Sequence, residues 1–482
     1  MTAPPLRWGL LGTGRICNDF CQALKLLPSA SVTCVAAASS PAAAAAFARK
    51  HGVPASCGGY AELVGRADVD CVYVGNVHVF RREVGELAIR AGKHVLLEKP
   101  AACSAEDARY LQRLAGERGV FLAEGMWTRY FPAVEHARRL IADEEIGEVV
   151  AVNSDFHFNT ADSEAYPASP LFDRKLAGGA SFYCAPYPIA AALMCFPQAF
   201  PEEEFGAAGT RDDRTGVDLQ GSVSLTFPGP GGAAPAGGGA GAAPALGGRG
   251  VAALSFGFVA ESAEETVILG TGGRITLHSP AHCPTRLTVV RKREGRGRGE
   301  EEVLEFPLPE ITAEVKAAGG FYYPNSAGLA YEAAAVARVI AAGGLSSPQY
   351  TFEETVEVLR IVEGFRERVG VKTPFEPGDA EPGGAEPGDA EPGDAEPGDA
   401  EPGDAQGEEG GGGSKAKEQL ETALEFAKKE GGGEGAAAGE APPAEEVAAA
   451  PAEEAAPAEA AAEAAANAET DQALGAEHVE KP

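Results

Sequence analysis

The stretch L-R-W-G-L-L-G-T-G-R-I-C, residues 6–17, decides the fold of the first part of the chain. Its first six residues predict a short buried strand, and the turn that follows opens a helix. In a Rossmann turn the first glycine makes the tight bend and the second lets the backbone approach a pyrophosphate at the helix N-terminus. Cys17 occupies the third small position, and a plain strand–helix turn is the alternative. We predict a dinucleotide site at Gly12, Thr13, Gly14, Arg15 and Ile16.

Strand and helix patterns alternate through the first 130 residues, which predicts βαβ units and a parallel sheet. After about residue 130, strand patterns follow one another with mostly short connections, which predicts a second, mainly antiparallel open-faced sheet. The expected fold is therefore α/β, a Rossmann domain joined to an α+β domain. Expected strands are 6–11, 32–37, 69–74, 94–97, 120–123, 219–227, 251–259, 265–269, 274–277, 286–290 and 303–306, and expected helices are 15–27, 41–51, 80–91, 105–118, 133–142, 183–195, 327–341 and 352–369.

Composition divides the chain further. Residues 376–482 hold 29 acidic and 5 basic residues and begin with six pentads of E-P-G-D-A or E-P-G-G-A, so they predict a disordered acidic tail. The Pro/Gly/Ala-rich stretch 229–250 reads as a flexible hairpin insertion. We expect a nucleotide-binding domain over 1–130, a substrate and dimerisation domain over 131–374 and the tail over 375–482. A partner-binding helix at 415–429 is a lesser possibility.

Several classes of protein are excluded by what the chain lacks. Nine cysteines, an odd number without a C-x-x-C pair, argue against a disulfide framework or a zinc site, so we expect no metal and a reducing compartment. No apolar run approaches the ~20 residues of a membrane helix, and no charged-then-apolar stretch precedes the first strand, so we expect no signal peptide. No basic stripe suggests nucleic-acid binding. The expected location is the cytoplasm.

The choice of cofactor follows from an absence. NAD sites place an acidic residue at the end of the second strand, where it accepts from the ribose hydroxyl. No acidic residue occurs from Phe20 to Ala61, and the second strand is followed by Ser39 and Ser40. Both hydroxyls can donate to a 2′-phosphate, and Arg15 is expected nearby. We therefore predict NADP as the cofactor.

Further motifs carry a resemblance to a known family. They are Glu98-Lys99-Pro100 after the fourth strand, F-L-A-E-G-M-W-T-R-Y-F-P at 121–132, Tyr73-Val74-Gly75, Gly178-Gly179-Ala180 and the strand pair of 270–277. Over residues 6–374, apart from 229–250, the chain resembles the glucose–fructose oxidoreductase/inositol dehydrogenase (Gfo/Idh/MocA) family. It is most similar to the branch of dimeric dihydrodiol dehydrogenase and NADP-dependent D-xylose dehydrogenase.

The resemblance implies an active site between two domains and a homodimer formed through the open sheet face. It implies a cis peptide bond at Lys99-Pro100 and adds cofactor-binding residues to those of the glycine turn. These are Asn76, His78, Glu98, Lys99 and Pro100. For His78 a merely structural role is an equal alternative.

The resemblance also implies the catalytic pair. Lys99 is expected to bind the reacting oxygen and to lower the pKa of the acid/base, for which Tyr187 holds the branch's position. Two departures are Tyr183, where the family has Asp, and Arg81, where it often has His. On one continuous helix Tyr183 and Tyr187 would share a face. Loss of the carboxylate puts recognition of sugar hydroxyls in doubt.

An aromatic substrate pocket is implied by the positions of several residues, although core packing is an alternative for each. The expected substrate-binding residues are Trp127, Arg129, Phe156, Tyr183 and Tyr322, with Phe158 and Tyr323 nearby. The resulting hypothesis is an NADP-dependent dehydrogenase of a sugar such as D-xylose or of a cyclic trans-dihydrodiol. Alternatives are a related sugar or polyol dehydrogenase or reductase, and a non-catalytic NADP-sensing regulator.

Overall fold

The computed structural model describes residues 5–371 except 39, 164–165, 197–200, 202–203, 229–249 and 293–298, all within one compact unit, Met1–Gly432. Ser39, the predicted tail, its 415–429 segment and nearly all of the 229–250 insertion lie outside the described residues. The predictions about them therefore remain predictions. No helix of the described ranges is long and apolar enough to cross a bilayer.

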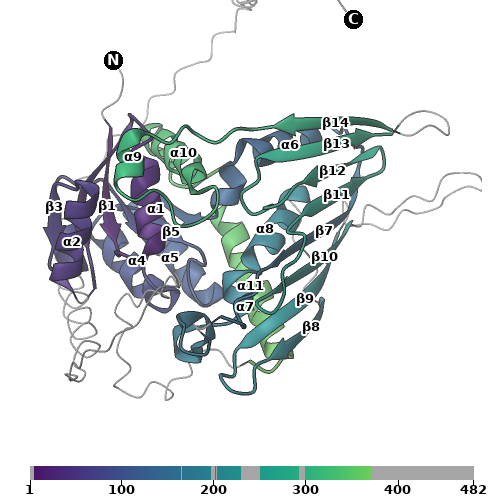
Figure 1. The fold of residues 1–482 in the computed structure, drawn as a ribbon, viewed down its shortest axis with the longest axis horizontal. Helices are drawn as coiled ribbons and strands as arrows, with labels where there is room; N and C mark the ends of the chain where they lie inside the picture. Colours follow the sequence, from purple (N-terminus) through teal and green to yellow (C-terminus); the bar gives the residue numbers. More distant parts are fainter. Residues whose placement is uncertain are drawn as a thin grey trace, which may run out of the picture. The chain divides into compact units, whose positions relative to one another are not determined.

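A six-stranded parallel sheet forms the first half, in the order β3-β2-β1-β4-β5-β6 (Figure 1). This doubly wound order confirms the predicted Rossmann fold. The short β3 and α3 were missed, because three- and five-residue elements show too little periodicity to detect. The elements are β1 Leu6–Leu11, α1 Arg15–Leu24, β2 Ala30–Ala36, α2 Pro41–His51, β3 Ala55–Cys57, α3 Tyr60–Val64, β4 Cys71–Val74, η1 His78–Phe80, α4 Arg81–Arg90, β5 His94–Glu98, α5 Ala105–Arg118 and β6 Leu122–Gly125.

An eight-stranded sheet follows, in the order β14-β13-β12-β11-β7-β10-β9-β8. Its strands are antiparallel except for the pair β7/β10, so the predicted mainly antiparallel sheet is confirmed. The sequence analysis missed β7 and β8, although β7 pairs with strands on both sides. The strands are β7 Val149–His157, β8 Gly206–Arg211, β9 Asp218–Phe227, β10 Gly250–Gly257, β11 Thr266–Gly270, β12 Gly273–Leu277, β13 Arg286–Arg291 and β14 Glu300–Glu305.

The predicted helix over 183–195 is wrong in one respect that matters for the site. It is broken into α7 (Ala180–Tyr183) and α8 (Pro186–Cys195). Pro186 has no N–H to continue a helical ladder, so it starts a new helix instead. Tyr183 and Tyr187 therefore do not lie on one helix face. The remaining helices are η2 Trp127–Tyr130, α6 Pro132–Ala142, η3 Pro170–Phe172, η4 Arg174–Leu176, α9 Ala313–Ala317, η5 Ser326–Gly328, α10 Leu329–Ala341 and α11 Phe352–Arg368.

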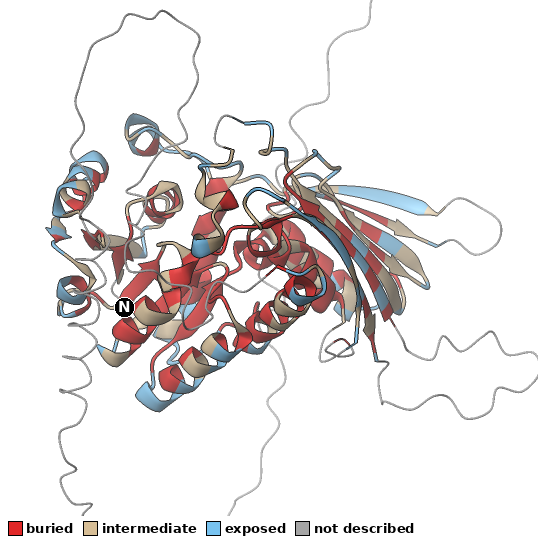
Figure 2. Ribbon diagram, turned by 90° about the horizontal axis from the view of Figure 1, so that it is seen from below, coloured by how far each residue is buried: buried red, intermediate tan, exposed pale blue. Residues whose placement is uncertain are grey.

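Helices α8 and α11 connect the two sheets. α8 packs on β7 and β10 of the eight-stranded sheet, and α11 packs on α8 and on α5 beside the parallel sheet (Figure 1). In Figure 2 the helices are red on the sides that face the sheets and paler on their outer sides. The other face of the eight-stranded sheet carries half-buried and exposed side chains, among them Val251, which is 51% exposed. The candidate functional site described below lies where β5, η2, α7 and α8 meet.

Candidate active site

The glycine turn after β1 has the geometry of a phosphate-binding loop. Gly12 has φ 131°, and a β-carbon there would lie 3.0 Å from Cys17 Sγ and 3.1 Å from Gly75 O. A β-carbon on Gly14 would meet nothing within 4 Å, so open space lies beside the N-terminus of α1. No side chain caps that helix end. Backbone N–H groups facing open space at a helix start suit a pyrophosphate, so the turn fits a dinucleotide.

Cys17, the residue that departs from the glycine fingerprint, is accommodated by a third glycine. A β-carbon on Gly75, just after β4, would lie 2.3 Å from Cys17 Sγ. Because Gly12 and Gly75 both lack side chains, the thiol fits between the turns that follow β1 and β4 and is fully buried there. The departure therefore leaves the shape of the turn intact.

Arg81 organises the ends of two neighbouring strands. Its Nε and Nη2 donate to the carbonyl of Asn76 at 3.1 and 2.8 Å, and its Nη1 donates to the carbonyls of Glu98 and Pro100 at 2.9 and 2.7 Å. The Lys99-Pro100 bond is cis. Asn76 Oδ1 is buried without a partner in the described part of the chain, so it can accept from a ribose hydroxyl. Sequence reasoning had noted Arg81 as a departure but not this role.

The adenosine end of the predicted site is described only in part. Ser40 caps α2, its Oγ accepting from the N–H of Ala43 at 3.1 Å, and the hydroxyl hydrogen is left for another acceptor. The Arg15 guanidinium lies 5.6 Å from the centre of the Tyr322 ring, beside the glycine turn.

Lys99 occupies the centre of the site. Its Nζ donates to the carbonyl oxygen of Tyr183 at 2.7 Å and lies 4.4 Å from the centre of the Tyr187 ring. Burial lowers the pKa of Lys99, whereas the nearby Glu98 raises it. The ammonium has three donors, and among the described residues only Tyr183 accepts from it. Lys99 can therefore donate to a bound oxygen without breaking that contact.

Tyr187 lies on the other side of Lys99, within an aromatic cluster. Its hydroxyl accepts from Trp127 Nε1 at 3.3 Å, and its ring meets the Phe156 ring edge-on at 5.2 Å between centres. Burial and the charge of Glu98 hold the pKa of Tyr187 well above its usual value, although the Trp127 hydrogen bond acts in the opposite sense. The phenol is therefore protonated at neutral pH. The lowered pKa expected from Lys99 is not found in this structure.

Tyr183 faces a different neighbour. Its ring meets the His78 ring at 5.2 Å between centres, and burial raises its pKa. His78 Nε2 lies 3.0 Å from the carbonyl of Ala177, and burial lowers the pKa of His78 to about 3. His78 is therefore neutral, and Nε2 donates to that carbonyl. The structure thus places Tyr183 and His78 on one side of Lys99 and Tyr187 on the other.

The Gly178-Gly179 pair fixes the start of α7. Gly179 has φ 123°, and a β-carbon there would lie 2.3 Å from Asp218 Oδ1. Asp218 accepts from the backbone N–H and the hydroxyl of Ser181 at 2.6 and 2.9 Å, and from Arg366 Nη1 at 2.9 Å. This fully buried ion pair anchors the helix whose last carbonyl holds Lys99.

Two expected substrate-binding residues have other contacts. The Arg129 guanidinium reaches the pocket wall, but it donates to the carbonyls of Ala190 and Gln349 and to Glu354. Tyr322 lies beside α1, because its N–H donates to the buried carboxylate of Asp19 at 2.8 Å, and its hydroxyl accepts from Lys50 at 3.4 Å. The sequence does not reveal these partners, and the substrate-binding roles of both residues remain predictions.

His282 is a site residue that sequence reasoning missed. Its ring lies 5.3 Å from the Tyr187 ring and 4.5 Å from the Phe156 ring, measured between centres. Its Nδ1 lies 3.5 Å from Glu264 Oε2. No pattern in the sequence pairs these two residues, since they meet only where the segments that flank β11 and β12 come together. A search for histidines beside predicted strands would have found the candidate but not its partner.

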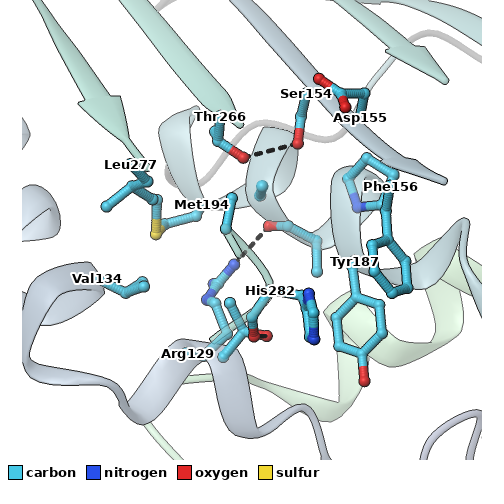
Figure 3. A pocket seen from close by; sticks show the side chains of 15 residues that line it. Arg129, Val134, Ser154, Asp155, Phe156, Tyr187, Met194, Thr266, Leu277 and His282 are labelled. Carbon is cyan, nitrogen blue, oxygen red and sulfur yellow. Dashed lines mark hydrogen bonds between the residues drawn. The ribbon is translucent and has the colours of Figure 1, made fainter. Parts of the chain in front are cut away.

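A small pocket lies behind Tyr187, between α8 and the eight-stranded sheet (Figure 3). Tyr187, Phe156 and His282 line it, but Lys99 and Trp127 do not. In Figure 3 the Tyr187 hydroxyl and one ring nitrogen of His282 point to the same side, away from Ser154 and Thr266 on the strands. No cluster of metal-ligating side chains occurs in the described ranges.

Comparisons with known proteins agree with this geometry. Residues 6–126 match the oxidoreductase family with an NAD-binding Rossmann fold, and residues 134–276 match the GFO/IDH/MocA C-terminal domain. Trans-1,2-dihydrobenzene-1,2-diol dehydrogenase of Sus scrofa is 33% identical over 370 residues, covering 77% of this chain and 98% of the relative. The Danio rerio enzyme of the same name is 34% identical over 370 residues, covering 76% and 97%.

Solved structures share the fold. A 3-ketoreductase from Actinomadura kijaniata, in complex with NADP and TDP-benzene, superimposes with a TM-score of 0.58 at 23% identity, covering 75% of this chain and 97% of that one. Levoglucosan dehydrogenase, in complex with NADH and levoglucosan, gives 0.62 at 20% identity, covering 76% and 97%. Fold, dinucleotide turn and curated relatives agree: the chain belongs to the Gfo/Idh/MocA family of oxidoreductases.

Proposed function

We propose that this protein is an NADP-dependent dehydrogenase that interconverts a secondary alcohol and a carbonyl compound on a sugar or a cyclic trans-dihydrodiol. The observation that carries the proposal is the position of Lys99 and Tyr187. The ammonium and the phenol meet at the carboxyl end of β5, where α/β sheets bind ligands, beside the dinucleotide turn. The relatives named for a dihydrodiol favour the same chemistry.

The oxidised nicotinamide, when bound, would accept the hydride that leaves the carbinol carbon. In that direction the phenolate form of Tyr187 takes up the hydroxyl proton, and in the reverse direction the phenol donates a proton to the carbonyl oxygen. Lys99 donates a hydrogen bond to the same substrate oxygen. Trp127 holds the Tyr187 hydroxyl, while Trp127 and Phe156 provide an apolar wall for the carbon face of the substrate.

For the cofactor, we propose NADP. Residues 20–61 hold no carboxylate to repel a 2′-phosphate, and Ser40 keeps a hydroxyl hydrogen for it at the start of α2. Gly12, Thr13, Gly14, Arg15 and Ile16 would surround the pyrophosphate, with Asn76 and Glu98 toward the nicotinamide ribose.

An assay of the purified full-length chain tests the proposal. NADP⁺ or NAD⁺ is combined with D-xylose, with trans-1,2-dihydrobenzene-1,2-diol and with a panel of other sugars, and the reduced nicotinamide is followed by its absorbance. We expect turnover with at least one diol or sugar. Tight NADP binding without turnover of any compound would instead support the NADP-sensing regulator.

We also propose a homodimer formed through the open face of the eight-stranded sheet. Exposed Val251 and Ala253 on β10 lie on that face, and Ala253 lies between Ser224 of β9 and Asn153 of β7. Small and apolar side chains leave a sheet face flat enough for a second copy. Sedimentation of the wild type and of Val251→Arg tests this: a dimer that becomes a monomer supports the proposal, and a monomeric wild type contradicts it.

A further inference from the structure

We propose that His282, which lies beside Glu264, binds a second substrate hydroxyl next to the reacting one, so that the enzyme selects vicinal diols over single alcohols. This inference rests on the proposed dehydrogenase function and names its substrate class more narrowly.

The position of the His282 ring is set by its backbone. The residue follows β12, where Ala281 N–H donates to the carbonyl of Glu264 at 2.9 Å and the carbonyl of His282 itself accepts from the Thr128 hydroxyl. Thr128 lies in η2 next to Trp127. The imidazole is therefore tied both to the eight-stranded sheet and to the segment that carries the aromatic wall.

Glu264 places a carboxylate near one ring nitrogen of His282. Its Oε2 lies 3.5 Å from His282 Nδ1 without forming a hydrogen bond, and both side chains are mostly buried, at 18% and 13% exposure. A carboxylate beside Nδ1 favours the tautomer with the proton on that nitrogen. Burial lowers the pKa of His282. The neutral ring then presents Nε2 as a hydrogen-bond acceptor.

His282 Nε2 is available to a ligand. No residue in the described part of the chain hydrogen-bonds it, and it is not among the fully enclosed unpartnered atoms. The Tyr187 ring lies 5.3 Å away between centres, and the two polar ends point to the same side (Figure 3). Two adjacent oxygens on one carbon ring match a phenol and an imidazole side by side. The faces of Phe156 and Trp127, 4.5 and 6.1 Å from the imidazole centre, suit the carbon skeleton.

The chain contains a second histidine–glutamate pair, which differs from His282 and Glu264 in how the ring nitrogens are partnered. His278 Nδ1 lies 3.0 Å from Glu265 Oε1, but its Nε2 lies 2.7 Å from Thr288 Oγ1. Both nitrogens of His278 are thus used within the protein, and the residue does not line the pocket. His282 differs because neither of its ring nitrogens is hydrogen-bonded within the described part of the chain, so His278 provides a matched control.

The expected preference for vicinal diols over single alcohols has a physical origin. A single alcohol binds through Tyr187 and Lys99 but leaves Nε2 unpaired among aromatic rings, and an unpaired buried polar atom costs about 1–3 kcal/mol. A vicinal diol has a second hydroxyl that can donate a hydrogen bond to Nε2. A site built to bond a hydroxyl rejects an analogue that lacks it more strongly than an apolar pocket rejects an extra group.

The test compares trans-cyclohexane-1,2-diol with cyclohexanol as substrates of the full-length wild type, His282→Leu, His282→Gln and the control His278→Leu. Relative to wild type, His282→Leu should raise the KM for the diol by roughly 10–100-fold, the equivalent of one hydrogen bond of about 1–3 kcal/mol, and should lower the diol-to-alcohol ratio of kcat/KM. Gln places an acceptor near the position of Nε2, so His282→Gln should recover most of the loss. His278→Leu should leave the ratio unchanged.

Three results would overturn the inference while leaving the proposed function standing. They are an unchanged KM in His282→Leu, a loss confined to kcat, and a Gln variant as impaired as the Leu variant. A wild type that oxidises no sugar or diol would overturn the proposed function itself, and this inference with it.

Discussion

The ammonium nitrogen of Lys99 lies over the face of the Tyr187 ring, 4.4 Å from its centre, and not in line with the hydroxyl. Its hydrogen bond goes to the Tyr183 carbonyl instead. Lys99 therefore acts on Tyr187 through its charge, and its remaining donors are available to the substrate oxygen. The two residues form one proton-handling unit around that oxygen.

Replacing either Lys99 or Tyr187 should lower kcat nearly as much as replacing both. Tyr187→Phe removes the transferable proton and should lower kcat by roughly 10²–10⁴, the usual effect of losing general acid–base catalysis. Lys99→Met should have a similar effect, and the double variant should be little worse. Steady-state kinetics measure this, and cofactor titration should show intact NADP binding in Tyr187→Phe.

Tyr183→Phe is the matched control, since the ring of Tyr183 faces His78 and only its carbonyl contacts Lys99. That variant keeps the carbonyl and should chiefly raise KM. A near-normal Tyr187→Phe enzyme beside an inactive Tyr183→Phe enzyme would transfer the acid/base role to Tyr183.

The raised pKa of Tyr187 makes the two reaction directions differ in their pH dependence. Below that pKa the phenol is protonated, so it is ready to donate in carbonyl reduction, and only a small phenolate fraction can accept a proton in alcohol oxidation. That fraction grows about tenfold per pH unit. Oxidation should therefore accelerate from neutral to alkaline pH, while reduction should stay nearly flat.

A rate profile in each direction checks this, with Tyr187→Phe expected to lose the alkaline rise. Because burial lowers the pKa of Lys99, oxidation should fall again at the highest pH, where the ammonium is lost. An oxidation rate that is flat from neutral to alkaline pH would show that Tyr187 is not the base.

Much of the fold could be predicted from the sequence, because its strands are apolar and its helices are bounded by clear signals. Helix α5 matches the prediction at both ends, since Ser104 caps its start and Gly119 ends it in the left-handed conformation. Strand β7 was missed even though it pairs with two neighbours, because V-V-A-V-N-S-D-F-H contains polar residues that face the open side of the sheet.

The site was predictable only where motifs are local. The glycine turn and Glu98-Lys99-Pro100 depend on neighbours in the chain. The pair Glu264–His282 and the clamp of Arg81 on Asn76 and Pro100 depend on segments that meet only in the folded state. For the same reason, the sequence analysis put recognition of sugar hydroxyls in doubt because of Tyr183 without considering the proposed role of His282.

Cofactor preference should change with one charge at the start of α2. Ser40→Asp keeps a side-chain acceptor for the N–H of Ala43, so the helix cap survives, while the new carboxylate faces the predicted 2′-phosphate. We expect NADP binding to weaken by about 1–3 kcal/mol relative to NAD. Ser40→Asn, which caps without charge, is the control. Fluorescence titration with both cofactors measures the preference, and equal affinities in the wild type would contradict the NADP assignment.

The acidic tail should be dispensable for catalysis. Its composition provides too little apolar surface to offset the entropy of ordering it. A chain that ends at Phe375 should fold with an unchanged kcat, as judged by circular dichroism and the dehydrogenase assay. Unfolding or loss of the dimer on truncation would show that the domain boundary near residue 374 is misplaced.

The buried pair Asp218–Arg366 should be among the most sensitive positions for stability. Both side chains are fully buried, and Arg366→Met would leave the Asp218 carboxylate inside the protein without a cation. Breaking such a pair on one side typically costs about 3–5 kcal/mol. Burial already raises the pKa of Asp218, while Arg366 lowers it, so the variant should bind a proton at Asp218 more readily.

Urea denaturation at several pH values measures both effects. At neutral pH Arg366→Met should unfold at a clearly lower urea concentration than wild type. Because loss of Arg366 raises the folded-state pKa of Asp218 further, lowering the pH toward that pKa should reduce the difference from wild type. Arg138→Met, which breaks the half-exposed pair with Glu135 on α6, is the control and should cost no more than about 1 kcal/mol. If the two variants lose the same stability, Arg366 does not anchor α7. The Tyr183 carbonyl that holds Lys99 would then be positioned by the backbone turn at Gly179 alone.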